Sequence, residues 1–196
     1  MPRIRTYLAA PLFNDRERAF NESLAAILST HCDVFLPQRD GLLLAELLAS
    51  GIPPNVAETR IFERDRLALT KCEMLVAVLD GAHIDEGVAF ELGFAHARGC
   101  LCLGLQSDTR RALPSGNNPM IGRALSSIFT STRDLTSCIS FEHALRTGGS
   151  HAQPNCSLPS ENERPCCWPT ALDNHEIRVH QTVCRSVTEQ EFDQAD

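Results

Sequence analysis

The sequence predicts an α/β protein with a doubly wound, flavodoxin-like or Rossmann-like fold, in which helices cover both faces of a five-stranded parallel sheet. Short apolar strands alternate with helical segments from residue 4 to residue 146, and this alternation is typical of a parallel sheet covered by helices. The segment MLVAVL at 74–79 is apolar throughout, as expected for a strand that is buried on both faces. The 196 residues suffice for one domain of ordinary size and an additional segment.

Five strands are expected along the chain. Each is a short apolar run, and the first two are closed by Pro11 and Pro37, because proline donates no hydrogen bond to a sheet. The last run, SIFT, is the weakest of the five. Their ranges are 4–9, 33–36, 74–79, 100–105 and 127–130.

Helices are expected between the strands, where apolar side chains recur three or four residues apart. A leucine-rich helical segment ends at Gly51 and at the Pro53–Pro54 pair that follows it. The segment NNP at 117–119 is interpreted as a loop that begins a further short helix. The expected helices are 15–30, 41–50, 55–71 and 86–98, with a last turn or two at 141–146.

Ligands of such sheets bind outside the carboxyl ends of the strands. Four segments of this chain occupy that position, and they carry most of its candidate functional side chains. They are AAPLFN (9–14), PQRDG (37–41), DGAHIDEG (80–87) and QSDTRR (106–111).

Charge and hydropathy argue against several classes of function. The formal net charge of −7 disfavours a general binder of nucleic acid or of anionic membranes, because both usually need a basic face. No apolar run approaches the ~20 residues of a membrane helix, and the first residues show no secretory cleavage pattern. We therefore expect a cytoplasmic protein with no nucleic-acid partner and no membrane partner.

The composition changes from Thr147 onward, where Gly, Ser, Pro, Asn, Glu and Gln accumulate and no apolar period survives. We predict one domain at 1–146 and a polar, poorly ordered, cysteine-containing tail at 147–196. The tail has no C-x₂-C pair, so we expect no metal there and keep a tail zinc site as the less favoured alternative. The remaining cysteines are interpreted as small buried hydrophobes: Cys32, Cys72, Cys100, Cys102 and Cys138.

A glutamate stands in the middle of the apolar helical segment DEGVAFELG (85–93). Glu91 shares a helical stripe with Val88, Leu92 and Ala95 that should face the sheet, although burying an unpaired charge costs several kcal/mol or more. The helix begins at the ligand-binding edge, so its dipole should favour the ionised carboxylate. Such a group is a usable nucleophile. The alternative is a structural glutamate that is bonded to a tyrosine or to the backbone.

The other polar candidates each have a structural explanation as well. Asp85 is a good helix N-cap, Asp65 fits a solvated helix face beside two arginines, and Tyr7, the only tyrosine, fits a core position. The sequence has no G-x-G-x-x-G, P-loop, G-x-S-x-G or H-E-x-x-H motif. What remains is carboxylate chemistry at a strand edge, which suits displacement at a sugar carbon.

The order of five motifs resembles the nucleoside 2-deoxyribosyltransferase family over roughly residues 1–146. DEGVAFELG after an apolar strand, with an aspartate twenty residues before Asp85, is the most specific of them. The motifs are YLAAPLFN (7–14), FLPQRDG (35–41), the Asp65 stretch, DEGVAFELG (85–93) and NNPMI (117–121).

The resemblance implies a role for each matching residue. Glu91 would be the nucleophile that forms a covalent deoxyribosyl-enzyme, and Tyr7 would orient it. Asp65 and Asp85 would contact the base and handle its proton. The implied substrate-binding residues are Gln38, Gly87, Asn118, Met120 and Phe13.

The implied activity is transfer of 2-deoxyribose between bases by a retaining double displacement, with a deoxynucleoside and a free nucleobase as substrates and no cofactor or metal. Such a pentosyltransferase would serve nucleoside salvage. The resemblance also implies a homo-oligomer in which Asn118 reaches a neighbouring subunit's site. The family usually ends near Arg146, so the tail departs from its pattern.

Two alternatives remain open. The first is an N-glycoside hydrolase with water as acceptor, acting on deoxynucleosides or deoxynucleotides. Related deoxynucleotide hydrolases hold the phosphate with a Ser/Gly/Arg-rich first loop, which AAPLFN lacks, so a free nucleoside is favoured. The second is a non-catalytic nucleoside-binding or protein-binding module, in which Glu91 is structural.

Overall fold

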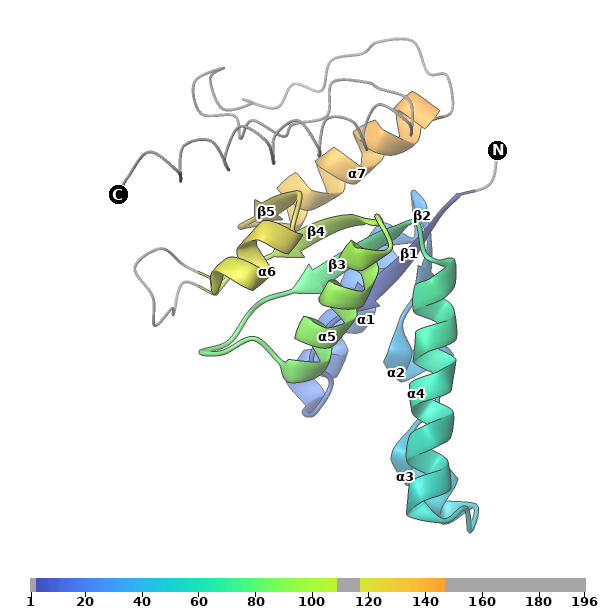
Figure 1. Ribbon diagram of the computed structural model, residues 1–196. Coiled ribbons are helices and arrows are strands. Elements are labelled where there is room, and N and C mark those ends of the chain that lie inside the picture. The colour runs from blue at the N-terminus through green and yellow to red at the C-terminus, as the bar shows by residue number, and fades with distance from the viewer. Residues whose placement is uncertain (1–2, 109–116, 147–196) are drawn as a thin grey trace. The chain divides into compact units, whose positions relative to one another are not determined.

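The computed structural model describes residues 3–108 and 117–146. Within them, five strands form one sheet in the order β2-β1-β3-β4-β5, and every pair of neighbours is parallel (Figure 1). This arrangement confirms the predicted α/β fold class. The strands are β1 (Ile4–Ala9), β2 (Cys32–Phe35), β3 (Met74–Val78), β4 (Leu101–Leu105) and β5 (Ser127–Phe129).

Helices cover both faces of the sheet (Figure 1). Helices α1 and α7 pack on one face, while α4, α5 and α6 pack on the other. The short helix α3 packs along α4. The helices are α1 (Asp15–Leu28), α2 (Pro37–Asp40), α3 (Leu44–Ala49), α4 (Pro54–Lys71), α5 (Glu86–Ala97), α6 (Pro119–Ala124) and α7 (Thr132–Arg146).

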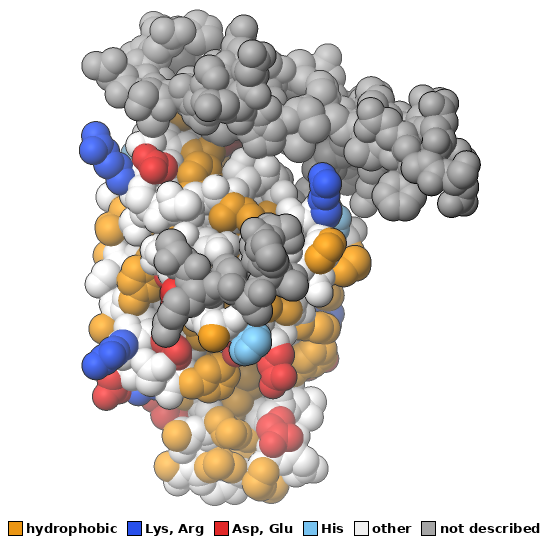
Figure 2. Space-filling view, turned by 90° about the vertical axis from the view of Figure 1, so that its left-hand side faces the viewer, with side chains coloured by type: hydrophobic (Ala, Val, Ile, Leu, Met, Phe, Trp, Pro, Cys, Tyr) orange, Lys and Arg blue, Asp and Glu red, His pale blue; other side chains and the backbone are white. Residues whose placement is uncertain are grey.

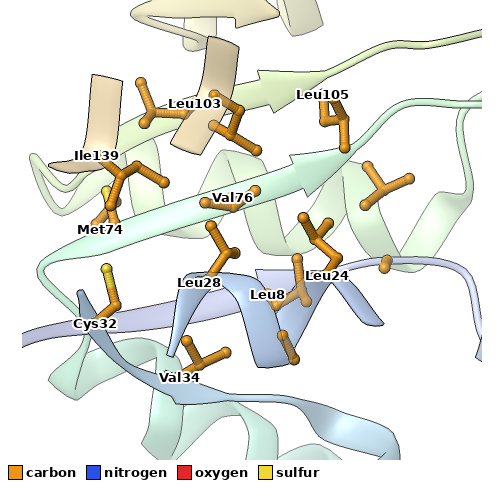
Figure 3. Close-up of a cluster of buried hydrophobic side chains, with 14 of the residues drawn as sticks. Leu8, Leu24, Leu28, Cys32, Val34, Met74, Val76, Leu103, Leu105 and Ile139 are labelled. Atoms are coloured by element: carbon orange, nitrogen blue, oxygen red, sulfur yellow. The ribbon is translucent and has the colours of Figure 1, made fainter. Parts of the chain in front are cut away.

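One hydrophobic cluster fills the space between the sheet and helices α1 and α7. Figure 3 shows Leu24 and Leu28 from α1 against Leu8 and Val76 of the central strands, with Ile139 of α7 beside them. These side chains are at most a few per cent exposed. Burial of this kind stabilises by roughly 25 cal/mol per Å² of apolar surface, which explains why the segments with an apolar stripe are the ones that form these helices.

The opposite cluster holds the elements that carry most of the candidate site residues. Val88, Leu92 and Ala95 of α5 and Leu69 of α4 pack on the side chains of the central strands that point to this face. Tyr7 belongs to the same cluster. The apolar stripe of α5 is therefore buried as predicted, and it brings the glutamate of the same stripe towards β1.

Two parts of the chain differ from the elements expected from sequence. One helix was expected at 41–50, but the structure has two short ones. Helix α2 lies before that range, because Pro37 begins a helix readily, and α3 lies within it. Helix α7 starts at Thr132, well before the expected turn at 141–146. Ser131 was the signal in the sequence for this earlier start. Its hydroxyl accepts a hydrogen bond from the Asp134 amide at 3.2 Å and donates one to the Asp134 carboxylate at 2.7 Å.

The sheet has its switch point between β1 and β3. The chain leaves β1 through α1 on one face, and it leaves β3 through α5 on the other. A crevice at the carboxyl ends of these two strands is the usual ligand position in such folds. None of the helices within 3–108 and 117–146 is both long and apolar enough to cross a bilayer. The predicted tail at 147–196 lies outside the described residues.

Candidate active site

Helix α5 holds the central carboxylate in place through ordinary helix signals. The side chain of Asp85 caps its first turn by accepting a hydrogen bond from the Val88 amide at 3.0 Å. Gly99, with φ of 76°, ends it in a left-handed conformation that glycine adopts without strain. Between these ends, the buried stripe of α5 fixes the rotation of the helix and leaves Glu91 partly buried over β1.

Tyr7 is the direct partner of Glu91. Its hydroxyl donates a hydrogen bond of 2.5 Å to Oε1 of Glu91, although the two residues are 84 positions apart in sequence. The tyrosine is fully buried, so its ring has little freedom and the hydroxyl is held at one place. A donor fixed in this way orients the carboxyl group without the cost of ordering it during a reaction.

The ring of Tyr7 is itself supported from the side. Phe35 stacks on it with ring centroids 5.4 Å apart, and the guanidinium of Arg64 lies 5.7 Å from the centroid of Phe35. The same guanidinium donates hydrogen bonds to the Asp40 carbonyl at 2.9 and 3.3 Å. This stack, which joins β1, β2 and α4 behind the carboxyl group, was missed by the sequence reasoning because its members lie far apart in the chain.

Asp65 on α4 lies close enough to raise the pKa of both Tyr7 and Glu91 by charge repulsion. It is partly buried, whereas its sequence context fitted a solvated face. Its Oδ1 atom is buried without a hydrogen-bond partner within the described residues. An unpaired buried oxygen is costly, so this atom is suited to bind a polar group of a ligand.

Burial dominates the electrostatics of the site. It raises the pKa of Glu91 to about 8, with added repulsion from Asp65 and Asp85, and the Tyr7 hydrogen bond offsets only part of that rise. Burial also raises the pKa of Asp65 to about 6, against a smaller lowering by Arg64. Glu91 therefore holds its proton more tightly than Asp65 does.

The helix-dipole argument favoured the ionised form of Glu91 and so a lowered pKa, whereas the pKa of Glu91 is raised. The dipole acts mainly within the first turn of a helix, and Glu91 is the sixth residue of α5, which begins at Glu86. At that depth, desolvation and two neighbouring carboxylates outweigh the dipole. The site therefore holds a carboxyl group whose proton is available near neutral pH.

The remaining predicted residues fall into two groups. Gly87 lies beside Asp85, since a Cβ added there would be 3.0 Å from the Asp85 Oδ1 atom. Phe13 and Met120 are strongly exposed, at 74% and 80%. Asn118 caps α6 by accepting a hydrogen bond from the Met120 amide at 2.9 Å, and α6 packs against α5.

Gln38 faces a different direction from the Glu91 cluster. Its carbonyl accepts a hydrogen bond from Asn21 at 3.0 Å, and its amide nitrogen donates to the Arg18 carbonyl and to Glu22, both at 3.0 Å. All three partners belong to α1. The side chain of Gln38 thus fastens α2 to α1, and contact with a bound base would require it to leave these partners.

Loops at the carboxyl edge are tied together by side chains that sequence reasoning did not single out. The Asp80 carboxylate, at the end of β3, accepts hydrogen bonds from the amide and the hydroxyl of Ser107, both at 2.6 Å. The amide of Asn117 donates to Gln106 at 2.8 Å. The signal in the sequence for this role of Asp80 was its place in DGAHIDEG, at the same edge of the sheet as QSDTRR.

The face at the carboxyl ends of the strands is viewed directly in Figure 2. On the part of this face that the residues drawn in grey leave visible, acidic side chains lie among hydrophobic ones. Within 3–108 and 117–146, no three His, Cys, Asp or Glu side chains are grouped so as to hold a metal ion.

Gly41 closes the wall of the site beside Asp65, and we expect Gly41→Ala to lower the free energy of unfolding by about 1–3 kcal/mol. An added Cβ would sit 2.4 Å from the Pro37 carbonyl oxygen, a backbone atom, and 3.1 Å from the Asp65 Oδ1 atom. Urea denaturation measures the loss. Gly93→Ala is the control: a Cβ there meets nothing within 4 Å, so that variant should be stabilised by up to about 1 kcal/mol. Equal stabilities for the two variants would contradict the geometry.

Comparison with known proteins points to one family. The model of the nucleoside 2-deoxyribosyltransferase family matches residues 6–161. No curated protein matches the sequence.

Solved structures share the fold. A conserved protein from Enterococcus faecalis V583 is 25% identical with a TM-score of 0.58, and the match covers 71% of this chain and 99% of that one. A 2-deoxyribosyltransferase from Bacillus psychrosaccharolyticus is 21% identical with a TM-score of 0.57, over 67% and 89% of the two chains. The likeness to both lies in the parallel sheet and its helices, the frame that places Tyr7 against Glu91.

Proposed function

Because this chain belongs to the nucleoside 2-deoxyribosyltransferase family, we propose that it moves the 2-deoxyribosyl group from one nucleobase to another. The observation that carries this proposal is the 2.5 Å hydrogen bond from the buried Tyr7 hydroxyl to Glu91. A partly buried carboxyl group with a fixed donor at the switch point of the sheet is suited to attack a sugar carbon. The substrates are a 2′-deoxyribonucleoside and a free nucleobase.

In the first step, an ionised Glu91 oxygen forms a bond to the anomeric carbon while the bond from that carbon to the base nitrogen breaks. The bonding electrons leave with the base, which takes a proton from a neighbouring acid. The product of this step is a covalent deoxyribosyl-glutamate. A second base then attacks the same carbon and releases Glu91, so that two inversions give net retention.

Asp65 is better suited than Asp85 to give the proton to the departing base. Its pKa is raised to about 6, so a useful fraction is protonated near neutral pH, and its Oδ1 atom has no protein partner within the described residues. The Oδ1 atom of Asp85 is occupied as the N-cap of α5. We assign Asp85 to positioning of the helix and contact with the base, and Asp65 to the proton.

The two raised pKa values predict the pH dependence of kcat/KM for the donor. The productive form needs Glu91 ionised and Asp65 protonated, yet Glu91 holds its proton more tightly, at about 8 against about 6. The productive form is therefore a minority of about one in a hundred, and its share is highest between these values. We expect a bell-shaped profile with limbs near pH 6 and 8, measured by initial rates. A profile that is flat from pH 5 to 9 would contradict this assignment.

The experiment that tests the function offers deoxyinosine with and without adenine and follows the products by chromatography. A transferase makes deoxyadenosine and needs the acceptor base, whereas a hydrolase releases hypoxanthine at the same rate without it. If deoxyinosine binds and no product forms with any acceptor base, the chain is a non-catalytic binding module and the proposal fails.

We further propose that the active protein is a homo-oligomer in which Asn118 serves a neighbouring subunit's site, as the family resemblance implies. The residue is exposed at the N-cap of α6, near the exposed Met120. If so, the Glu91→Ala and Asn118→Ala variants, each far less active than the wild type when alone, should recover part of the wild-type rate after they are unfolded together and refolded as a mixture. In mixed oligomers some sites combine the intact Glu91 of one subunit with the intact Asn118 of its neighbour. A mixture no more active than the average of its parts would place Asn118 in its own subunit's site.

A further inference from the structure

Two cysteines meet at the amino-terminal edge of the sheet, where α4 and α5 both end. Cys72 is the residue that ends α4, and Cys100 follows Gly99, just after α5 and before β4. Their Sγ atoms are 3.7 Å apart although the residues are 28 positions apart in sequence. Both side chains are partly exposed, so a small reagent can reach them, and both pack against the hydrophobic cluster that contains Tyr7.

The backbone holds the two thiols facing each other. The Cys72 Sγ atom is 3.2 Å from the Leu69 carbonyl oxygen, and the Cys100 Sγ atom is 3.3 Å from the Cys72 carbonyl oxygen. A disulfide has an S–S distance of about 2.05 Å, so closure needs an approach of less than about 2 Å. Rotation of two side chains at the surface of the cluster can supply it.

The two thiols differ in acidity, and the difference gives them different roles. The hydrogen bond from Cys72, together with the nearby charge of Arg98, lowers the pKa of Cys100, while the same hydrogen bond and burial raise the pKa of Cys72. Cys100 is therefore the thiolate that attacks an oxidant. The neighbouring Cys102 is buried, which raises its pKa to about 12 and makes it unreactive.

We propose that Cys72 and Cys100 are a redox-sensitive dithiol that closes to a disulfide on exposure to hydrogen peroxide. The Cys100 thiolate attacks a peroxide oxygen, breaks the O–O bond and becomes a sulfenic acid, and the released hydroxide takes the Cys72 proton to form water. The Cys72 thiolate then attacks the sulfenic sulfur and expels hydroxide, which is protonated to a second water. Two thiols and one peroxide thus give one disulfide and two waters.

The disulfide would join the ends of the two helices that carry Asp65 and Glu91. It closes a loop of about thirty residues, which restricts the unfolded chain, and it prevents the ends of α4 and α5 from separating. Oxidation should raise the Tm of the folded domain by roughly 5–10 °C. The inference concerns the thiols alone, so it stands or fails independently of the proposed transferase activity.

Peptide mapping of the full chain tests the proposal. Reduced protein is treated with hydrogen peroxide, alkylated and digested with trypsin, whose cleavage after Lys71, Arg98 and Arg110 places Cys72 in peptide 72–98 and Cys100 in peptide 99–110. We expect these two peptides to be linked, with fragment ions assigning the bond to Cys100 rather than Cys102. The proposal would be overturned if both cysteines were recovered in separate alkylated or over-oxidised peptides. It would also be overturned if Cys72 were bonded to Cys102.

Variants connect the bond to the Tm. The peroxide-induced rise in Tm should disappear in Cys72→Ser and in Cys100→Ser, should return to the starting value on reduction of the wild type, and should persist in Cys102→Ala. Because all variants are compared with their own reduced state, a loss of basal stability does not obscure the result. If the Tm of Cys72→Ser rose by the same amount on peroxide treatment, the rise would come from other cysteines and the proposal would be rejected.

Discussion

Replacing Glu91 by alanine is expected to lower kcat/KM for base exchange by about 10⁴-fold or more, because the variant has no group that can bond to the anomeric carbon. Glu91→Gln should lose as much activity while still accepting the hydrogen bond that Tyr7 donates at 2.5 Å. This second variant separates chemistry from packing, since it keeps the shape and the partner of the side chain. Chromatographic rate assays measure both losses.

Glu86→Gln is the matched control for these variants. Glu86 lies on the same helix but is exposed, in the first turn of α5, so its neutralisation should leave the rate within about twofold of the wild type. A donor nucleoside mixed with wild-type protein and quenched in acid should leave one deoxyribosyl unit on peptide 72–98, and this adduct should be absent from Glu91→Gln. Base exchange at the wild-type rate in Glu91→Ala would overturn the assignment of the nucleophile.

Replacing Tyr7 by phenylalanine is expected to lower kcat/KM by about 10²–10³-fold, the usual cost of losing one preorganised donor. The phenyl ring keeps its stack on Phe35 at 5.4 Å, so the fold should persist. The hydrogen bond lowers the pKa of Glu91, and a bond to a charged group is worth about 1.5–3 kcal/mol. Its removal should therefore move the alkaline limb of the pH profile, near pH 8, upward by about one to two units.

If Tyr7 were merely structural, its replacement by phenylalanine would not shift the alkaline limb of the pH profile. Thr6→Val is the matched control, because it removes another buried hydroxyl from the adjacent position of β1, on the opposite face of the sheet. It should change stability without changing the pH profile. An unchanged alkaline limb in Tyr7→Phe would mean that the hydroxyl does not control the ionisation of Glu91, even if the rate falls.

Much of the fold was predictable because its strands and helices have strong local signals. The range of β1 was predicted to the residue, and β2, β3 and β4 were predicted within one residue at each end. The start of α7 was missed because its stripe of Leu135 and Ile139 is narrow, although Ser131 and Asp134 formed a recognisable cap. Local patterns decide where an element forms, and a weak pattern needs the sheet to support it.

The sequence by itself determined the order of strands and helices, the parallel α/β class, the family resemblance and the residues around which a site could form. Only the tertiary structure decided that Tyr7 donates to Glu91, that Asp65 has a buried unpaired oxygen, and that Gln38 is held by α1. It also decided that burial raises the pKa of Glu91. The reason is that strand and helix patterns repeat within a few residues. Hydrogen-bond partners and desolvation, in contrast, depend on segments that meet only when the chain is folded.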